Sequence, residues 1–220
     1  MVSGVDSPAR VYRSDLRQQQ AARTRRRVVE AAVEVFGERG YQATTFAQLA
    51  DRAGVSIETV QKHGPKSALM WAAVELASFG VEGKVDFFDT ALGKAMLEIR
   101  DPVRLAEYSG EATLAVNEPS AGVWMAFTGA ANGDPDLRAL LDGRLASIRT
   151  QTERILAVVA ERGWLRTDVP FDDLVEAHCV LTSIESYVRF VHLDGKSREQ
   201  YAAFVTRTIR DSILVLNRLA

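Results

Sequence analysis

The sequence has little of the chemistry that builds disulfide frameworks, metal centres or membrane spans. A single cysteine, Cys179, excludes an intramolecular disulfide and a multi-cysteine metal site, which is typical of a reducing cytoplasm. The apolar runs are too short to cross a bilayer, and charged residues occupy the N-terminus where a signal peptide needs an apolar stretch. We therefore expect a cytoplasmic globular protein without membrane contact.

The parts of an enzyme are also scarce. The three histidines, His63, His178 and His192, lie far apart, and there is no glycine-rich phosphate loop or nucleophile signature. His178 directly precedes Cys179, but adjacent residues of a helix point in different directions and do not easily share a ligand. We therefore predict neither an enzyme nor a metal or cofactor site.

Net charge is small, at −2, but it is unevenly distributed. Residues 1–66 contain eleven Lys and Arg against seven Asp and Glu, a net charge of +4, whereas the rest of the chain carries −6. A basic head on an acidic body suits a protein that contacts a polyanion at one end. Chance clustering on a solvated face is the alternative.

Almost every segment beyond residue 16 has helical rather than strand periodicity, and the breaks carry recognised signals. Asp101-Pro102 and Asp134-Pro135 each place an acidic N-cap before a proline in the first helical position, and Ser197 with Gln200 predicts a capping box. The expected fold is all-α, with a mobile arm over 1–16, a three-helix helix-turn-helix domain over 17–66, and a helical bundle over 67–220.

Three short helices are predicted in the N-terminal domain. The first runs from about Arg23 to Glu38, and Thr45 caps the second. Gly54 provides the positive φ that a tight turn between two helices needs, and Ser56 caps a third helix, Ile57 to about His63. That helix is polar around one apolar residue, Val60, which is typical of a recognition helix; a surface hairpin without a DNA role is the alternative.

The segment from Arg23 to Leu69, RTRRRVVEAAVEVFGERGYQATTFAQLADRAGVSIETVQKHGPKSAL, resembles the DNA-binding region of the tetracycline-repressor (TetR) family. The resemblance implies a homodimer of helical subunits, each with an N-terminal reader and a C-terminal bundle that dimerises and holds a small-molecule inducer. Aromatic residues are usual in the family where Gln61, His63 and Gly64 stand here. The alternative is therefore a degenerate member, a dimeric small-molecule-binding or interaction module with weak DNA recognition.

DNA-contact roles are predicted for polar residues of the reader. Gln61 would read adenine, Lys62 or His63 would reach guanine or phosphate, and Glu58 would accept from cytosine or face solvent. The resemblance places a phosphate-binding lysine near Lys66, at a helix N-terminus. The remaining candidates at this surface are Arg23, Arg25, Arg26, Arg27, Thr44, Thr45, Ser56, Ile57 and Thr59.

Aromatic and methionine side chains of the bundle are the candidates for holding an apolar or aromatic inducer, although each also fits an ordinary core. These are Trp71, Phe87, Phe88, Tyr108, Trp124, Met125 and Phe127, together with His178. Apolar stripes over 171–191 and 197–219 predict a dimer interface, although burial within one subunit gives the same pattern. The interface candidates are Leu174, Leu181, Ile184, Val188, Phe204 and Ile213.

Together these features predict a ligand-responsive transcriptional regulator. A homodimer would bind a double-stranded palindromic operator as a repressor, and a small-molecule inducer would release it. Inducer binding would be coupled to the helix that follows the reader, which links the pocket to the head, and the coupling would be reciprocal.

Overall fold

The computed structural model describes residues 8–83 and 85–215, and its regular secondary structure there is helical, as predicted. The helices are α1 (Pro8–Ala43), α2 (Phe46–Ala53), α3 (Ile57–Gln61), α4 (Lys66–Phe79), α5 (Ala91–Glu98), α6 (Pro102–Ala131), α7 (Pro135–Glu161), α8 (Phe171–Leu181), α9 (Ile184–Tyr187) and α10 (Arg198–Ser212). A 3₁₀ turn, η1 (Phe87–Asp89), precedes α5, and a π-helical turn, η2 (Val188–Leu193), follows α9. None of the described helices is long and apolar enough to cross a membrane.

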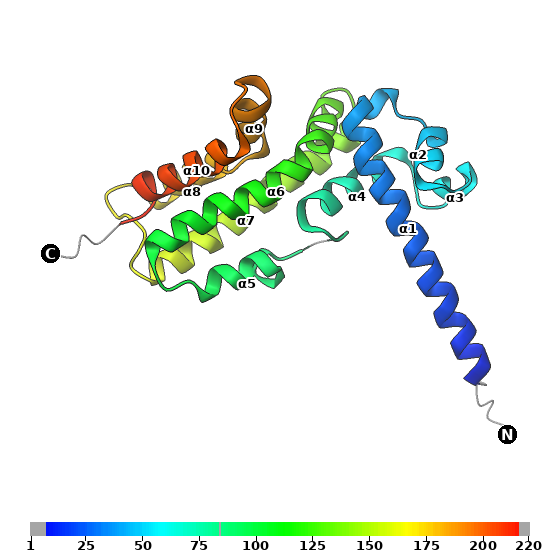
Figure 1. The fold of residues 1–220 in the computed structure, drawn as a ribbon, viewed down its shortest axis with the longest axis horizontal. Helices are drawn as coiled ribbons and strands as arrows, with labels where there is room; N and C mark the ends of the chain where they lie inside the picture. The colour runs from blue at the N-terminus through cyan, green and yellow to red at the C-terminus, as the bar shows by residue number, and fades with distance from the viewer. Residues whose placement is uncertain (1–7, 84, 216–220) are drawn as a thin grey trace.

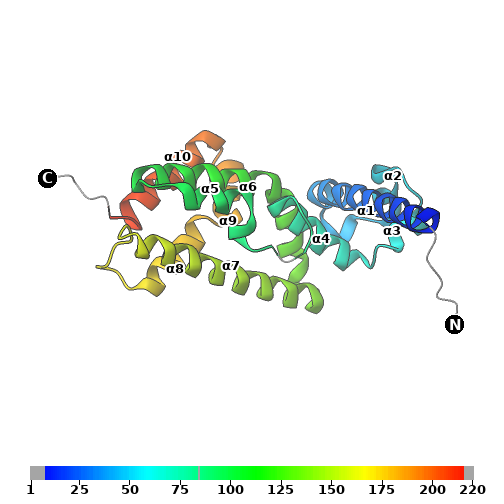
Figure 2. The same cartoon turned by 90° about the horizontal axis from the view of Figure 1, so that it is seen from below.

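The helices form a head of α1–α3 at one end and a body of α5–α10 at the other (Figures 1 and 2). The long α6 connects them, because it contacts α1 and α4 on the head side and α10 in the body. One apolar cluster fills the head and its junction with α4 and α6, around Phe36 and Leu49. A second fills the body, around Leu156 and Tyr201. Each part therefore has a core of its own.

Helix α1 begins well before the predicted start near Arg23. Residues 8–16, which the sequence predicted to be part of a mobile arm, are helical; residues 1–7 lie outside the described residues. The side chains of residues 16–23 are all exposed, so this extension needs no apolar stripe and periodicity could not reveal it. Its Gln, Ala and Arg residues favour a helix by intrinsic propensity. The helical geometry breaks at Gly40, whose φ is 75°.

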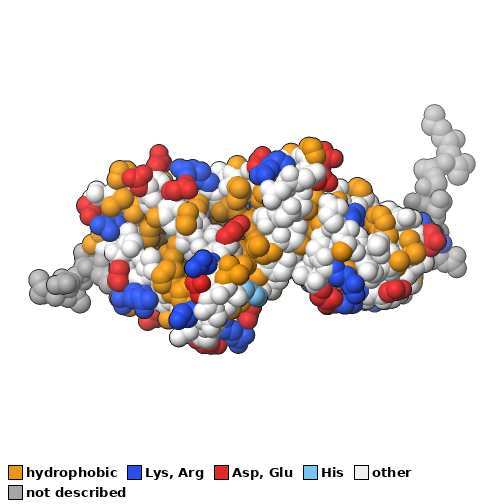
Figure 3. Space-filling view, turned by 90° about the horizontal axis from the view of Figure 1, so that it is seen from above, with side chains coloured by type: hydrophobic (Ala, Val, Ile, Leu, Met, Phe, Trp, Pro, Cys, Tyr) orange, Lys and Arg blue, Asp and Glu red, His pale blue; other side chains and the backbone are white. Residues whose placement is uncertain are grey.

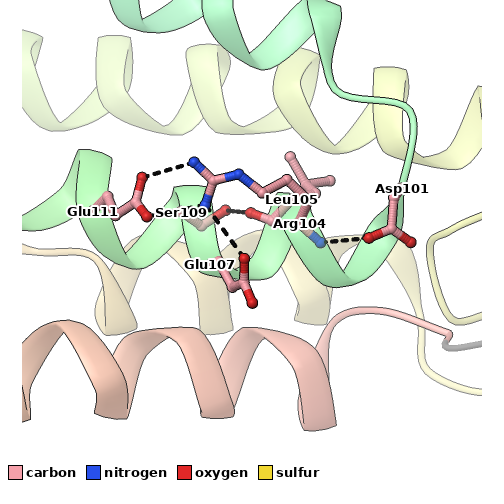
Figure 4. Close-up of polar contacts among 6 residues, drawn as sticks. All are labelled: Asp101, Arg104, Leu105, Glu107, Ser109 and Glu111. Atoms are coloured by element: carbon pink, nitrogen blue, oxygen red, sulfur yellow. Dashed lines mark hydrogen bonds and ion pairs between the residues drawn. The ribbon is translucent and has the colours of Figure 1, made fainter.

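The predicted caps of the longer helices are confirmed. At the start of α6, the Asp101 Oδ2 accepts a hydrogen bond from the Arg104 backbone N–H at 2.8 Å, and Pro102 occupies the first turn (Figure 4). The Arg104 guanidinium then pairs with Glu111 at 2.9 Å and with Glu107 at 3.4 Å. Asp134 caps α7 in the same way, and Ser197 with Gln200 forms a capping box on α10.

Two glycines of α6 allow its neighbours to approach closely. A Cβ on Gly122 would stand 3.2 Å from the Cα of Gly37, where α1 crosses α6. A Cβ on Gly110 would collide with the Thr206 Oγ1 and with the Ala202 carbonyl oxygen on α10. The head and α10 therefore both rest on the backbone of α6.

The single helix predicted over 171–191 is broken in the structure. α8 ends at Leu181, Ser183 caps the short α9, and η2 follows. At the break, the buried Asn117 of α6 donates to the carbonyls of Thr182 and Ser183, both at 3.0 Å. The apolar pattern continues through the break, so it indicated one helix.

Two of the predicted interface residues are buried within the subunit. Leu174 is 2% exposed and Ile213 is 1% exposed, and both belong to the body core, so they cannot contact a partner subunit. Leu181, Ile184, Val188 and Phe204 are half-buried, and Phe204 stacks on Phe190. Seen from the side of α9 and α10, hydrophobic side chains lie between charged ones over the body (Figure 3).

Candidate DNA-binding surface and ligand cavity

The helix-turn-helix has the local geometry that its sequence predicts. The Thr45 side chain and Gln48 form a capping box on α2. Gly54 adopts a left-handed conformation, with φ 63° and ψ 43°, and ends α2. The Ser56 Oγ then accepts from the Thr59 N–H at 3.2 Å and begins α3. Gly54 and Ser56 therefore set the angle between α2 and α3.

One side of α3 is buried and the other faces solvent. Val60 is fully buried and joins the head core, whereas Ile57 is 42% exposed and Glu58, Gln61 and Lys62 are exposed too. Ser56 and Thr45 are also exposed, and Thr59 is half-buried. The Glu58 carboxylate accepts hydrogen bonds from the Ser56 hydroxyl and from the Glu58 backbone N–H, and these bonds hold the pKa of the carboxyl below its ordinary value. The helix thus presents an uncovered polar face at the end of the molecule.

Three of the four predicted DNA-contact arginines make bonds inside the protein. Arg27 donates to the carbonyls of Ala53 and Gly54, at 2.5 and 3.2 Å, and braces the turn. Arg26 pairs with Glu30 and donates to the carbonyl of Gly80.

Arg25 joins three elements of the chain. Its Nη1 donates to the His63 carbonyl at 2.6 Å, just after α3, and its Nε and Nη2 bind the Glu82 carboxylate beyond α4. His63 is half-buried, and burial lowers the pKa of its imidazole. Arg23, in contrast, is exposed on α1. Arg25, Arg26 and Arg27 thus make hydrogen bonds that hold α1 to its neighbours, and the role of all four arginines in following the DNA backbone or entering a minor groove stays a prediction.

Two further predicted phosphate contacts are directed inward. The Lys66 Nζ donates to the carbonyls of Tyr41 and Thr44, at 2.8 and 3.2 Å, and lies 4.3 Å from the centre of the Tyr41 ring. Thr44 is 2% exposed, and its hydroxyl donates to the Gly40 carbonyl. Lys66 and Thr44 thus hydrogen-bond to carbonyls at and just beyond the end of α1, and their predicted contact with phosphate stays a prediction.

A cavity of about 530 Å³ lies in the body. Residues of α6, α7, α8 and α9 line it, with the end of α4 and the η1–α5 segment, and its volume is in the range of small-molecule sites. Four of the predicted pocket residues line it: Phe87, Tyr108, Trp124 and His178. Burial lowers the pKa of the His178 imidazole to about 4, so the ring is neutral near pH 7.

The other four predicted pocket residues lie elsewhere. Phe127 is fully buried in the head-side core, and Trp71 packs on it with ring centroids 5.7 Å apart. Met125 is 46% exposed, and Phe88 packs edge-on against Phe87 beneath Arg154. Their aromatic or apolar character fits core and surface positions as well as a cavity, which is why sequence could not separate them.

Sequence reasoning missed several polar residues of the cavity. Asn117 and Gln151 line it, as do the charged side chains of Arg144, Arg149, Glu176 and Glu185. The Trp124 Nε1 donates to the Glu185 carboxylate at 2.7 Å, and Arg149 pairs with Glu176 at 2.8 Å. In the sequence these residues look like the exposed polar faces of amphipathic helices. No group of three or more acidic, histidine or cysteine side chains among the described residues could hold a metal ion.

Comparisons with known proteins agree with this geometry. Residues 28–63 match the family model described as bacterial regulatory proteins of the tetR family, and none of the curated proteins compared matches the chain. The fold is similar to a transcriptional regulator from Saccharomonospora viridis in complex with choline, at 20% identity and a TM-score of 0.68, over 89% of this chain and 100% of that one.

Two further solved structures share the fold. The SmeT–triclosan complex is 18% identical, with a TM-score of 0.67 over 90% of this chain and 94% of that one. The fatty acid degradation regulator FadR from Bacillus halodurans is 18% identical, with a TM-score of 0.66 over 86% of this chain and 95% of that one. Residues 28–63, which contain the helix-turn-helix, thus match the model of the tetR family, and the fold of most of the remaining chain is similar to that of these solved structures.

Proposed function

We propose that the protein is a cytoplasmic repressor that binds a palindromic operator as a homodimer and leaves it when a small molecule occupies the cavity of the body. The observation that carries this proposal is the position of α3. The helix is held to the head by Val60, so that Ile57, Glu58, Gln61 and Lys62 face solvent behind the Gly54 turn. Such a face fits the major groove, where Gln61 would read adenine.

The phosphate contacts in this proposal come from fewer residues than the sequence predicted. Arg23, Thr45, Ser56, Thr59 and Lys62 are the candidates, because each is exposed or half-buried at the head. His63 remains a candidate through its half-exposed ring. Binding would depend on salt through these contacts.

Dimerisation would use the outer faces of α8, η2 and α10. Phe171 and Val180 of α8 are 40% and 60% exposed and Leu193 of η2 is 70% exposed, so apolar surface lies uncovered on α8 and η2. Two subunits paired there would present two copies of α3, as half-sites about one helical turn apart require. The half-buried Leu181, Ile184, Val188 and Phe204 would contribute from beneath.

Ligand response would pass through the end of α4. Phe79 lines the cavity, and the next residues carry the contacts to the head: Arg26 donates to the Gly80 carbonyl and Arg25 binds Glu82. A ligand that shifts this segment would therefore move Arg25, whose other bond holds the His63 carbonyl behind α3. Solved structures of similar fold contain choline and triclosan, which supports a small-molecule site in this chain.

One observation favours the degenerate alternative. Several of the cations predicted to contact DNA, including Arg25, Arg27 and Lys66, are bound within the protein, which leaves fewer charges for phosphates. Such a protein would keep the cavity and the dimer and bind DNA weakly.

Selection of genomic fragments by the purified full-length protein, against an excess of random competitor DNA, separates these possibilities. The proposal expects a recovered palindrome whose affinity exceeds that of random sequence by about 10³-fold or more at physiological salt. Retention no better than that of random sequence would support the degenerate module and reject the repressor.

A further inference from the structure

The described residues contain two buried side-chain nitrogens without a hydrogen-bond partner, and both belong to residues that line the same cavity. They are the Nε of Arg144 on α7 and the Nδ1 of His178 on α8. Buried polar atoms in folded proteins are almost always paired, so a site where two remain unpaired is a site that a ligand completes. Other polar side chains of the lining direct their donors to protein acceptors, among them Tyr108, Asn117, Trp124 and Gln151.

Arg144 places a buried positive charge in the cavity wall, and its Nε has no hydrogen-bond partner among the described residues. Its guanidinium lies 4.7 Å from the centre of the Phe79 ring. Burial lowers the pKa of Arg144, and the Glu75 carboxylate opposes that effect through its charge, while Glu75 itself accepts a hydrogen bond from the Gly83 N–H. Because guanidinium groups stay protonated in proteins, the positive charge remains in the cavity wall.

The other walls indicate the size and charge of the ligand. Apolar side chains, including Phe79, Phe87, Leu92, Met96 and Ile155, offer a surface for a hydrophobic body. The carboxylates of Glu176 and Glu185 also line the cavity, and Glu75 lies near Arg144, so a doubly charged phosphate would meet stronger repulsion than a singly charged group. The neutral His178 ring adds one hydrogen-bonding position.

We infer that the cavity takes an amphipathic carboxylate, whose single negative charge Arg144 binds, whose apolar body lies against the aromatic and aliphatic walls, and which offers His178 a further hydrogen-bonding group. This inference rests on the proposed ligand-responsive function and names the chemical class of its ligand. It also explains how binding of the ligand's charge would affect the head. Arg144 lies over Phe79, and the residues that follow Phe79 are held by Arg25 and Arg26 of α1.

The test is a panel of small probes that differ in one group. Three bodies, a phenylbutyl, a naphthylmethyl and a linear octyl group, are each prepared as the carboxylate, the primary amide and the ammonium compound. Isothermal titration of the full-length protein measures their affinities. For at least one body we expect the carboxylate to bind about tenfold or more tightly than its amide, because a hydrogen bond between two charged groups is stronger than one to a neutral group. The ammonium compound should bind most weakly, because the positive charge of Arg144 repels it.

Two substitutions on α7 assign that preference to one side chain. Arg144→Gln should bring the carboxylate affinity to within about twofold of the amide affinity, with amide binding retained as evidence that the cavity is intact. Arg138→Gln is the matched control, because Arg138 lies on the same helix, is exposed and donates to the Asn132 side chain outside the cavity. It should keep the preference of the wild-type protein.

The outcomes separate this inference from the function on which it rests. If no carboxylate of the panel binds, or if the amide or ammonium compounds bind as tightly, the inference is wrong, and retention of an operator decides the proposed function independently. The inference is equally wrong if Arg144→Gln keeps the carboxylate preference. If carboxylates bind selectively and no operator is retained, the ligand class stands and the repressor proposal falls.

Discussion

Arg25 of α1 and Glu82, just beyond α4, form a two-pronged ion pair, with Nη2–Oε2 and Nε–Oε2 distances of 2.7 and 3.0 Å. Both side chains are about 30% exposed, so water screens the pair only in part. The same guanidinium reaches the His63 carbonyl at 2.6 Å. One side chain therefore ties the turn after α3 to the segment that follows α4.

The first prediction concerns this pair. Glu82→Gln removes the charge that orients Arg25, so we expect operator affinity to fall several-fold while the midpoint of thermal unfolding changes little. Fluorescence anisotropy with a labelled operator measures the affinity. Glu107→Gln is the control, because Glu107 also pairs with an arginine but lies on α6, in the body. A rise in affinity after Glu82→Gln would mean that the released Arg25 binds phosphate instead.

The second prediction concerns Lys62 on the exposed side of α3. Lys62→Ala should weaken binding to all duplexes to a similar extent and reduce the slope of log K against log salt concentration by about one. Lys94→Ala, at an exposed position of α5, should leave both quantities unchanged. If the salt slope is the same in the two variants, Lys62 does not contact a phosphate.

Short-range signals in the sequence predicted the local structure well. The caps at Thr45, Ser56 and Asp101 and the turn at Gly54 depend on residues within a few positions of one another, so the sequence itself contains both partners. Family resemblance then supplied the arrangement of head and body. What periodicity could not reveal was the extension of α1, because a solvent-exposed helix has no apolar stripe.

Long-range partners account for the contacts that sequence reasoning did not predict. From the sequence, Lys66 and Arg27 look like phosphate ligands alone, whereas the fold brings carbonyls within their reach. Asn117 and Arg144 look like exposed helix residues until α8, α9 and the end of α4 close around them. A side chain's role in these cases depends on groups far away in the sequence, which composition and spacing do not record.

The third prediction compares the same substitution at two helical glycines. A Cβ at Gly143 of α7 would meet nothing within 4 Å, so Gly143→Ala should raise the free energy of unfolding by about 0.5–1 kcal/mol through helix propensity. At Gly110 the Cβ would collide with the backbone of α10, so Gly110→Ala should lower it by about 1–3 kcal/mol. Urea denaturation measures both, and equal effects would contradict the close α6–α10 crossing.

The fourth prediction concerns the pH dependence of stability. Burial lowers the pKa of His178 from 6.5 to about 4, so between these values the unfolded chain binds a proton that the folded chain does not. The free energy of unfolding should therefore fall as the pH is lowered from 6.5 to 4, by at most about 3 kcal/mol from this residue. Urea denaturation at a series of pH values across this window measures the slope.

Replacement of the imidazole isolates its share of that slope. His178→Asn removes the titrating group, so its free energy of unfolding should depend less steeply on pH between 4 and 6.5 than that of the wild-type protein. His192→Asn is the matched control, because it makes the same replacement at an exposed histidine of the neighbouring η2, outside the cavity. Parallel curves for the wild-type protein and His178→Asn would mean that His178 is protonated as readily in the folded chain as in the unfolded one, and that the cavity is open to water.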